Sequence, residues 1–269
     1  MIKFGFIGAG NMGGAMLRQA VKTYGAEQFL VSTASAKSRE KLQQELGVSI
    51  TGDNTRVAGE SRFCILAVKP YLLEELLPKL APVLTEQQVL ISVAAGVTIE
   101  QMKAWLGKQI RIVRAMPNTP AQVGEAMTGI CFDDSTYSKE EREEILAFFK
   151  SLGRIEEVPE KLLNAVIGIS GSSPAYVYLF LESLADNAVR AGLPRKIAYT
   201  MAAQTVLGAA RMVLETGRHP GELKDAVCSP GGTTIAGVAA LEEYGFRNAI
   251  LKAGEACQKR ALEMEKEEK

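Results

Sequence analysis

The stretch that decides the fold opens the chain and reads Ile2-Lys3-Phe4-Gly5-Phe6-Ile7-Gly8-Ala9-Gly10-Asn11-Met12-Gly13. It begins with a largely apolar run typical of a buried strand, and the residues after it repeat apolar side chains at helical spacing. A Gly-x-Gly-x-x-Gly loop between a strand and a helix favours dinucleotide binding. The first glycine permits a tight turn, the second lets a pyrophosphate approach the backbone, and the third lets the helix pack against the strand.

We therefore expect a pyrophosphate to bind the free N–H groups at the start of this helix, because that end carries partial positive charge. Two other interpretations fit the same loop: a glycine-rich turn without a ligand, and the related glycine loop of a methyltransferase. The expected contacts are the residues of the loop itself, Gly8, Ala9, Gly10, Asn11, Met12 and Gly13.

The end of the second expected strand distinguishes between the two nicotinamide coenzymes. An NAD site has an acidic residue about 20 residues after the glycine loop, where it binds the ribose 2′-hydroxyl. Residues 31–39 contain no acidic residue, but they do contain Ser35, Lys37 and Arg39. Hydroxyl and charge-assisted hydrogen bonds from such residues suit a 2′-phosphate. The segment favours NADPH, with NADH possible; the alternative is that Lys37 and Arg39 only form the solvated face of the next helix.

Short apolar runs alternate with amphipathic stretches through residue 159. This alternation predicts βαβ units, and hence an α/β Rossmann-type domain with a parallel sheet over residues 1–159. The expected strands are residues 2–7, 28–33, 63–68, 89–93, 110–115 and 154–158. The expected helices are residues 11–24, 38–46, 71–80, 99–105 and 140–152, and Gly47 is expected to end the second of them in a left-handed conformation.

Residues 160–269 have a different texture, with no convincing alternating run. They contain long stretches rich in Ala, Leu and Val, and Ile197 to Ala210 carries no charge at all. A helix that is apolar nearly all round must be buried on most sides. We therefore predict an all-α C-terminal domain that packs against a second copy of the chain; the alternative is that its helices wrap the Rossmann domain. The long helices are expected at Pro174–Ala191, Arg195–Thr216 and Phe246–Met264.

Composition limits the possible functions. Lysine plus arginine and aspartate plus glutamate each number 31, so the formal net charge is zero, which argues against nucleic acid or an anionic membrane as the main partner. A single histidine, His219, excludes a multi-histidine metal site, and the four cysteines form no Cys-x-x-Cys pair. Cys64 and Cys131 lie in apolar runs and are expected in the core. We expect no metal site and, because the N-terminus shows no signal-peptide pattern, a cytoplasmic protein.

Further short segments follow strands at the carboxyl edge of the expected sheet, where open α/β folds bind ligands. They are Ala67-Val68-Lys69-Pro70, Ala94-Ala95-Gly96 and Met116-Pro117-Asn118-Thr119-Pro120. Small residues at this edge would let a flat nicotinamide ring lie against the backbone, and Lys69 could reach the ribose or its phosphates. The alternative for Lys69 is an ordinary surface lysine whose stem covers apolar surface.

A second glycine-containing loop lies between helical stretches and reads Ser229-Pro230-Gly231-Gly232-Thr233-Thr234. Its Ser-Pro-Gly-Gly segment cannot continue a helix, so consecutive N–H groups are free where the next helix begins. We expect Thr233 or Thr234 to cap that helix. Such N–H groups bind a carboxylate or a phosphate; the alternative is a capped turn without a ligand.

Together these segments resemble pyrroline-5-carboxylate reductase, and the resemblance extends over essentially the whole chain. The glycine loop is shared with many dehydrogenases, whereas Gly168–Tyr176 and Ser229–Thr234 together are highly specific for this family. The matching motifs are Phe6–Gly13, Ala67–Pro70, Arg114–Pro120, Gly168–Tyr176 and Ser229–Thr234.

The resemblance implies an N-terminal Rossmann domain and a helical domain through which two copies interlock, sometimes assembled further into decamers. It implies NAD(P)H-dependent reduction of 1-pyrroline-5-carboxylate to L-proline. Carried over by motif, Ser35 and its neighbours would hold the adenosine ribose or its phosphate, and Asn54 the adenosine side. The nicotinamide half would be lined by Ala67, Val68, Lys69, Pro70 and Ala95.

The same resemblance implies a substrate site on the second loop. Backbone N–H groups would bind the substrate carboxylate, and the Thr234 hydroxyl would lie at the ring nitrogen as the catalytic group. The expected substrate contacts are Ser229, Gly231, Gly232, Thr233 and Thr234.

Two positions depart from the family pattern, and two rival functions fit parts of the sequence. Ser173 stands where the family usually has glycine, and Gly217-Arg218 stands where an acidic residue is often found. A β-hydroxyacid dehydrogenase would have a catalytic lysine early in the first helix of its helical domain, but residues 164–191 contain no lysine. A non-catalytic NADP-sensing protein would keep the first glycine loop and have no reason for the second.

Overall fold

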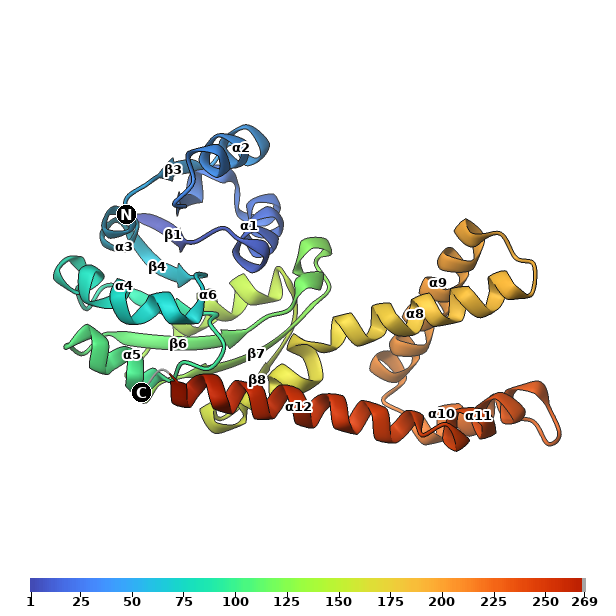
Figure 1. Ribbon diagram of the computed structural model, residues 1–269. Helices are drawn as coiled ribbons and strands as arrows, with labels where there is room; N and C mark the ends of the chain where they lie inside the picture. Colours follow the sequence, from blue (N-terminus) through green and yellow to red (C-terminus); the bar gives the residue numbers. More distant parts are fainter. Residues whose placement is uncertain (268–269) are drawn as a thin grey trace. The chain divides into compact units, whose positions relative to one another are not determined.

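The computed structural model describes the backbone of residues 1–267. The chain folds into two compact units (Figure 1). One unit, the sheet unit, comprises Met1–Ser172 together with the C-terminal stretch from Ala256, and the other, the helical unit, comprises Ser173–Glu255.

An eight-stranded sheet forms the centre of the sheet unit, in the order β3-β2-β1-β4-β5-β6-β7-β8. The strands from β3 to β6 are parallel, whereas β7 is antiparallel to β6 and parallel to β8. The strands are β1 (Ile2–Ile7), β2 (Phe29–Ser32), β3 (Ser49–Thr51), β4 (Ser61–Leu66), β5 (Val89–Ser92), β6 (Arg111–Met116), β7 (Ala126–Phe132) and β8 (Gly153–Glu157).

The prediction of a wholly parallel sheet is wrong at β7. The connection from β6 holds only a short 3-10 helix, Thr119–Val123, and parallel pairing needs a crossover of about a dozen residues or more. The chain therefore turns back and β7 pairs antiparallel, with Arg114 opposite Cys131. The short edge strand β3 and the strand β7 are both absent from the sequence-based assignment.

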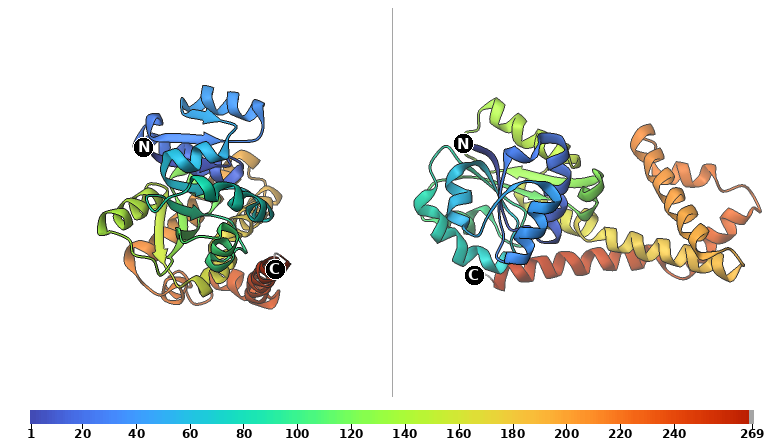
Figure 2. Two further views of the ribbon diagram at one scale, coloured as in Figure 1. Left: turned by 90° about the vertical axis from the view of Figure 1, so that its left-hand side faces the viewer. Right: turned by 90° about the horizontal axis from the view of Figure 1, so that it is seen from above.

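Helices cover both faces of the sheet (Figure 2). Within the strands, alternate residues point to opposite faces, so Phe63 of β4 joins one hydrophobic cluster while Cys64 joins the other. The helices are α1 (Asn11–Tyr24), α2 (Ala36–Leu46), α3 (Asn54–Glu60), α4 (Leu73–Leu80), α5 (Ile99–Leu106), α6 (Lys139–Lys150) and α7 (Leu163–Val166).

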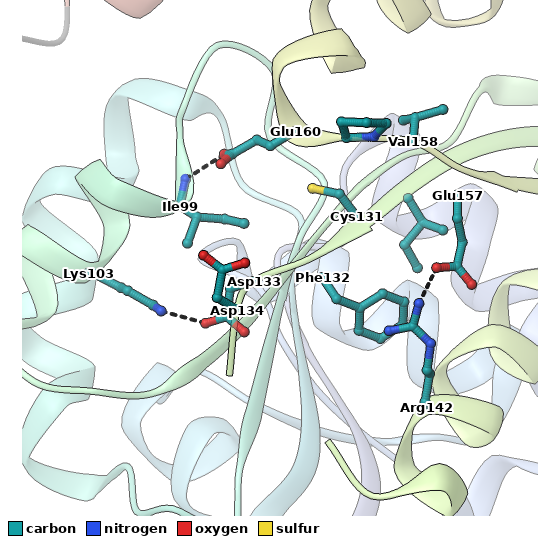
Figure 3. A pocket seen from close by; sticks show the side chains of 12 residues that line it. Ile99, Lys103, Cys131, Phe132, Asp133, Asp134, Arg142, Glu157, Val158 and Glu160 are labelled. Atoms are coloured by element: carbon teal, nitrogen blue, oxygen red, sulfur yellow. Dashed lines mark hydrogen bonds and ion pairs between the residues drawn. The ribbon is translucent and has the colours of Figure 1, made fainter. Parts of the chain in front are cut away.

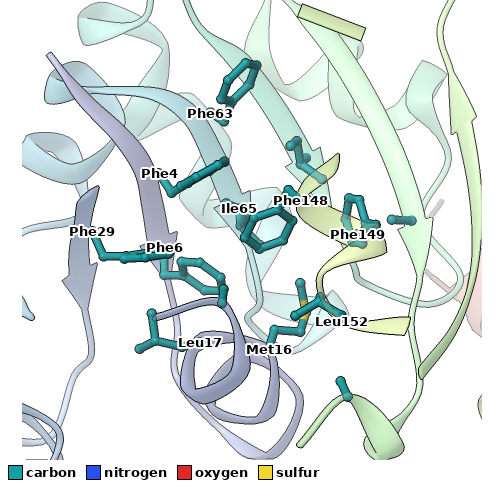
Figure 4. Close-up of a cluster of buried hydrophobic side chains, with 14 of the residues drawn as sticks. Phe4, Phe6, Met16, Leu17, Phe29, Phe63, Ile65, Phe148, Phe149 and Leu152 are labelled. Atoms are coloured by element: carbon teal, nitrogen blue, oxygen red, sulfur yellow. The ribbon is translucent and has the colours of Figure 1, made fainter. Parts of the chain in front are cut away.

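The first cluster packs α1 and α6 against the sheet and is rich in phenylalanine (Figure 4). The Phe4 ring lies 4.8 Å from that of Phe148 and 5.4 Å from that of Phe29, centroid to centroid. The second cluster packs α3, α4 and α5 against the other face and includes Cys64. Cys64 and Cys131 are both buried, which confirms them as core residues, and burial raises the pKa of the Cys64 thiol to about 12.

The second unit is built from helices alone, as the sequence predicts. α8 packs against α9, and the Tyr176 hydroxyl donates a hydrogen bond to the Ala253 carbonyl oxygen at 3.5 Å. Many of its large apolar side chains are exposed, among them Leu179, Met201 and Leu251. Its helices are α8 (Ser173–Arg190), α9 (Arg195–Thr216), α10 (Pro220–Ala226), α11 (Thr233–Glu243) and the first part of α12 (Phe246–Glu267).

One helix of the described residues, α9, is long and apolar enough to cross a membrane by length and composition alone. Only 11% of its most apolar window is buried within the chain. The apolar surface of this helix is therefore free to meet something outside the chain, as its charge-free sequence predicts.

Candidate functional site

The glycine loop follows β1 and leads into α1, in the strand–loop–helix context that the sequence predicts. Gly8 has a φ of 95°, and a Cβ there would lie 2.7 Å from the Ala67 carbonyl oxygen. A Cβ on Gly13 would lie 2.5 Å from the Gly8 carbonyl oxygen. Gly10 differs, since a Cβ there would meet nothing within 4 Å. The loop thus has two glycines required by close packing and one that leaves open space beside the start of α1.

Backbone hydrogen bonds bring the carboxyl ends of four strands side by side around this loop. The Gly8 N–H donates to the Ser32 carbonyl at the end of β2, and the Ala67 N–H donates to the Ile7 carbonyl at the end of β1. The Val93 N–H donates to the Leu66 carbonyl, which aligns β5 with β4. Ligands of open α/β sheets bind at this edge, at the point where the strand order reverses, which here lies between β1 and β4.

The β2 end of this edge carries the residues predicted to select the coenzyme. Ser35 is the N-cap of α2, and its hydroxyl oxygen accepts a hydrogen bond from the Ser38 N–H at 3.4 Å. Lys37 is exposed in the first turn of α2. The Arg39 guanidinium donates to the carbonyl oxygens of Thr33 and Ala34, at 2.7 and 3.0 Å. Arg39 therefore orders the loop that presents Ser35 and Lys37, a role that its sequence did not indicate.

Asn54 lies at the same end of the sheet, in the first turn of α3. The buried Ser32 hydroxyl donates to its side-chain oxygen at 2.6 Å. This bond orients the Asn54 carboxamide, so that its NH₂ group points away from Ser32. Asp53, the N-cap of α3, accepts hydrogen bonds from Thr55 and Arg56, and these bonds lower the pKa of its carboxyl group.

The predicted nicotinamide residues lie at the ends of β4 and β5. Ala67, Val68 and Pro70 are half-buried, and the Ala67 side chain would meet any Cβ placed on Gly13. Lys69 is exposed directly before a short 3-10 helix, Pro70–Leu72. Ala95 is half-buried after β5.

The second loop lies in the helical unit and ends at α11. Gly231 has a φ of 67°, and a Cβ on Gly232 would lie 2.4 Å from the Ser229 hydroxyl oxygen. Gly232 is the N-cap of α11, and no side chain caps this end among the described residues. The prediction that Thr233 or Thr234 caps the helix is therefore wrong. Gly232 has extended dihedral angles and takes the cap position, whereas Thr233 and Thr234 are already the first two helical residues.

The start of α11 consequently offers free backbone donors. The N–H groups of the first helical turn have no intrahelical acceptor, and the first carbonyl–amide bond runs from the Ala236 N–H to the Gly232 oxygen at 3.4 Å. Ser229, Thr233 and Thr234 are exposed around these donors. This arrangement suits a carboxylate, held by backbone N–H groups next to two hydroxyl groups.

A separate cavity of about 660 Å³ lies in the sheet unit and contains none of the predicted site residues (Figure 3). Its charged side chains pair with one another: Lys103 with Asp133 at 2.6 Å, Arg142 with Glu157, and Glu160 with the buried Arg114 at 2.7 Å. The Glu160 carboxylate also accepts a hydrogen bond from the Ile99 N–H at the start of α5. These pairs hold the fold together and leave Asp134, which is exposed at this cavity, as its unpaired charged side chain among the described residues.

Two titratable groups of this cavity are perturbed. Burial raises the pKa of the Cys131 thiol to about 11, which keeps the thiol neutral. Burial alone would raise the pKa of Asp133, but hydrogen bonds from Lys103, Tyr137 and Ser135 outweigh it and lower that pKa. Neither group is suited to nucleophilic or acid–base chemistry near neutral pH.

Comparisons with known proteins match both parts of the chain. Residues 160–264 match the family model for pyrroline-5-carboxylate reductase dimerisation, and residues 3–96 match that for coenzyme F420-dependent NADP oxidoreductase. The pyrroline-5-carboxylate reductase of Escherichia coli K12 is 42% identical over 98% of both chains. That of Glycine max is 44% identical over 97% of this chain and 95% of its own. The chain belongs to the pyrroline-5-carboxylate reductase family.

Solved structures of pyrroline-5-carboxylate reductases have the same fold. The Plasmodium falciparum enzyme with NADP bound is 32% identical, with a TM-score of 0.89 over 98% of both chains. The Coxiella burnetii enzyme is 35% identical, with a TM-score of 0.87 over 97% of this chain and 98% of that one. The dimerisation match covers the helices with exposed apolar side chains and supports the prediction that they pack against a second copy. The chain is thus a homo-oligomeric oxidoreductase with an NADP-binding Rossmann fold.

Proposed function

We propose that this chain reduces 1-pyrroline-5-carboxylate to L-proline, with NADPH as the hydride donor. One observation carries the proposal: a chain of this family presents two open helix starts, one at Gly10 before α1 and one at Gly232 before α11. The first suits the pyrophosphate of a dinucleotide, and the second suits the carboxylate of a small substrate.

The residues of the sheet edge fit NADPH. Open space beside Gly10 would admit the pyrophosphate, and Ser35 and Lys37 would bind the 2′-phosphate that distinguishes NADPH from NADH. Asn54, oriented by Ser32, would bind the adenosine side. When bound, NADPH supplies the hydride. The nicotinamide half would lie along Ala67, Val68, Lys69, Pro70 and Ala95.

The second loop fits the substrate. The backbone N–H groups of Thr233 and Thr234 at the start of α11, together with that of Gly231, would bind the carboxylate, whereas the Gly232 N–H already donates to the Ser229 carbonyl oxygen at 3.0 Å. Ser229 would lie beside the carboxylate, and the Thr234 hydroxyl would form a hydrogen bond with the ring nitrogen. A side chain at Gly232 would displace the Ser229 hydroxyl, since its Cβ would lie 2.4 Å from that oxygen and 3.1 Å from the Ser229 carbonyl oxygen. The Thr234 hydroxyl is free for this role because Gly232, rather than a threonine, caps the helix.

The reaction needs orientation more than activation. The imine carbon accepts the hydride with its electron pair, the carbon–nitrogen π electrons pass to the nitrogen, and the nitrogen carries a proton in the product. A protonated imine is already an electrophile. The protein therefore has to hold two rings in near-attack geometry and give the nitrogen a hydrogen-bond partner.

We also propose the domain roles and the setting of the enzyme. Residues 1–159 would bind the dinucleotide, and residues 160–269 would bind substrate and form a homodimer; the dimerisation match, which begins at residue 160, supports that boundary. The apolar surface of α9 would lie in the dimer interface rather than in a membrane. The same proposal includes assembly into a decamer, a cytoplasmic location and the absence of nucleic-acid or membrane partners. Size-exclusion chromatography with light scattering tests the assembly, and cell fractionation tests the location.

The decisive assay mixes the purified protein, NADPH and 1-pyrroline-5-carboxylate. We expect NADPH absorbance to fall and one L-proline to form for each NADPH consumed. If NADPH is not oxidised with this substrate but is oxidised with an acyclic ketoacid or semialdehyde, the chain is a dehydrogenase of the β-hydroxyacid type. If NADPH binds and is not oxidised with either, the chain is a coenzyme sensor.

A further inference from the structure

Asn118 lies just after β6, at the carboxyl edge of the sheet. It is only 6% exposed and is the N-cap of the 3-10 helix Thr119–Val123. Asparagine at such a position ordinarily accepts a hydrogen bond from a backbone N–H of the following turn. The Asn118 side chain makes no such cap bond. A buried carboxamide that does not cap its own helix needs another set of partners.

The partners of Asn118 are backbone groups from two distant segments. Its side-chain nitrogen donates to the Ser170 carbonyl oxygen at 3.0 Å, across 52 residues of sequence. Its side-chain oxygen accepts from the Met127 N–H, also at 3.0 Å, in β7. The amide therefore links three segments: the loop after β6, the start of β7 and the segment that contains Ser170. Each end of the amide therefore has a backbone partner in a distant segment.

Ser170 lies in a π-helical turn, Ile167–Gly171, closed by a hydrogen bond from the Ser172 N–H to the Ile167 carbonyl at 2.9 Å. Such turns are rare, and they occur frequently at functional sites. The Ser170 hydroxyl donates to the Val166 carbonyl at 3.1 Å, so the turn is also tied to α7. The chain passes through this turn into α8, the first helix of the helical unit. The Asn118 amide thus fixes the π turn, the last turn of the sheet unit before the chain enters α8.

We propose that Asn118 is a positioning residue for hydride transfer, acting through the π turn that it fixes. The inference rests on the proposed function, in which the coenzyme binds at the sheet edge and the substrate binds at the helical loop. The π turn is the stretch of chain through which the coenzyme-binding sheet unit continues into α8 of the substrate-binding helical unit. A misplacement of about 1 Å at a reacting centre costs about 100-fold in rate. By its bond to the Ser170 carbonyl, Asn118 fixes the backbone of the turn that precedes α8.

The test compares Asn118→Leu with a matched control, Gln88→Leu. Gln88 is another buried carboxamide, 2% exposed, that donates to the Gly59 carbonyl and accepts from the Thr85 N–H. It lies just before β5, at the amino end of that strand and away from the carboxyl edge. Both variants lose a buried amide bridge, so both should lose similar thermal stability. We expect kcat to fall about 10–100-fold in Asn118→Leu alone, with the Kd for NADPH changed less than about threefold.

A second variant, Asn118→Asp, tests the role of the donor. An aspartate carboxylate can still accept from the Met127 N–H, but it cannot donate to the Ser170 carbonyl, whereas the protonated acid can do both. We expect the kcat of Asn118→Asp relative to wild type to rise as the pH is lowered. A side chain that only contributes to stability would show no such recovery in kcat at a temperature where all variants are folded.

Two outcomes would overturn the inference: wild-type kcat in folded Asn118→Leu, or an equal loss of kcat in Gln88→Leu. Should Asn118→Leu fail to fold, a kcat of Asn118→Asp that matches wild type at every pH overturns it instead. The proposed function fails separately, because it fails only if the wild-type protein does not form L-proline.

Discussion

The sheet unit and the helical unit handle their apolar side chains in opposite ways. In the sheet unit, Phe4, Phe6 and Phe148 are fully buried between the sheet and its helices. In the helical unit, Leu179 is 65% exposed, Met201 58% and Leu251 65%. A single soluble chain rarely leaves so many large apolar side chains in water unless another surface covers them. The sheet unit is thus complete within one chain, whereas the helical unit is completed by a second copy.

The largest expected effect comes from placing charge on the helical surface. The double variant Leu179→Glu with Met201→Glu would bury uncompensated charges in the interface, at a cost of about 3–5 kcal/mol for each unpaired charge. We expect the dimer dissociation constant to rise more than about 100-fold and activity to fall with it. Sedimentation velocity gives the mass. The control, Val83→Glu, places a charge on an exposed apolar position of the sheet unit; a dimeric Leu179→Glu/Met201→Glu protein would remove these helices from the interface.

The next largest expected effect is a loss of activity when the Thr234 hydroxyl of the second loop is removed. We expect Thr234→Ala to lower kcat/KM for 1-pyrroline-5-carboxylate about 10–100-fold, the loss of one or two good hydrogen bonds at about 1.4 kcal/mol per tenfold. Thr85→Ala is the matched control, because the Thr85 hydroxyl donates to the Gln88 side-chain oxygen at 2.7 Å in the sheet unit, whereas the second loop belongs to the helical unit. Steady-state kinetics decide the matter, and near wild-type values for Thr234→Ala would remove that hydroxyl from the mechanism.

A smaller effect tests the first loop, where two glycines should behave differently. Gly10→Ala meets no atom of the protein, so the protein should keep its thermal stability. The Kd for NADPH should rise about tenfold, because the new Cβ would occupy the open space through which the pyrophosphate approaches the backbone. Gly13→Ala places its Cβ 2.5 Å from the Gly8 carbonyl oxygen and should cost about 1–3 kcal/mol of stability through overpacking. Fluorescence titration and thermal melts separate the two. If both variants lost stability equally, Gly10 would have no specific role in admitting the coenzyme.

The smallest expected effect is on the stability of the sheet unit, with no change in activity. Asp133→Asn removes the ion pair with Lys103 and should cost about 1–2 kcal/mol of stability while leaving kcat unchanged. Because the folded-state pKa of Asp133 is lowered, its stabilising contribution is present above the unfolded-state pKa of about 4 and is lost as the pH falls. Urea unfolding should therefore show the wild type's advantage narrowing below about pH 4. A constant advantage from neutral to acid pH would mean that Asp133 does not stabilise through its charge.

Much of the fold could be predicted because its signals are local. The apolar run at Ile2–Ile7 and the helix at Asn11–Tyr24 have the predicted bounds, and Gly47 ends α2 in the left-handed conformation expected of it. The missed elements lack such signals. Ser49–Thr51 is a three-residue edge strand without an apolar run, and Ala126–Phe132 contains Gly129, whose missing side chain makes room for Val166.

The residues of the site also fall into those that local sequence signals predict and those that only the tertiary fold brings together. The glycine positions could be predicted because each follows from a local backbone requirement: a positive φ at Gly8 and close packing at Gly13. The bonds of Arg39 to two carbonyls, of Ser32 to Asn54 and of Asn118 to Ser170 join residues that only the tertiary fold brings together. A pattern in sequence could mark Asn118 as part of a motif, but it could not indicate its partners. The prediction of a threonine cap is wrong because Gly232 is the N-cap residue of α11.

The central claim is a direct hydride transfer from NADPH, bound at the sheet edge, to the imine carbon of the substrate. The most direct measurement uses NADPH in which both hydrogens at nicotinamide C4 are replaced by deuterium, with unlabelled 1-pyrroline-5-carboxylate, and locates the label in the product by NMR. We predict L-proline with one deuterium at the former imine carbon for each NADPH oxidised. Unlabelled proline, or oxidation of NADPH without proline, would contradict the account.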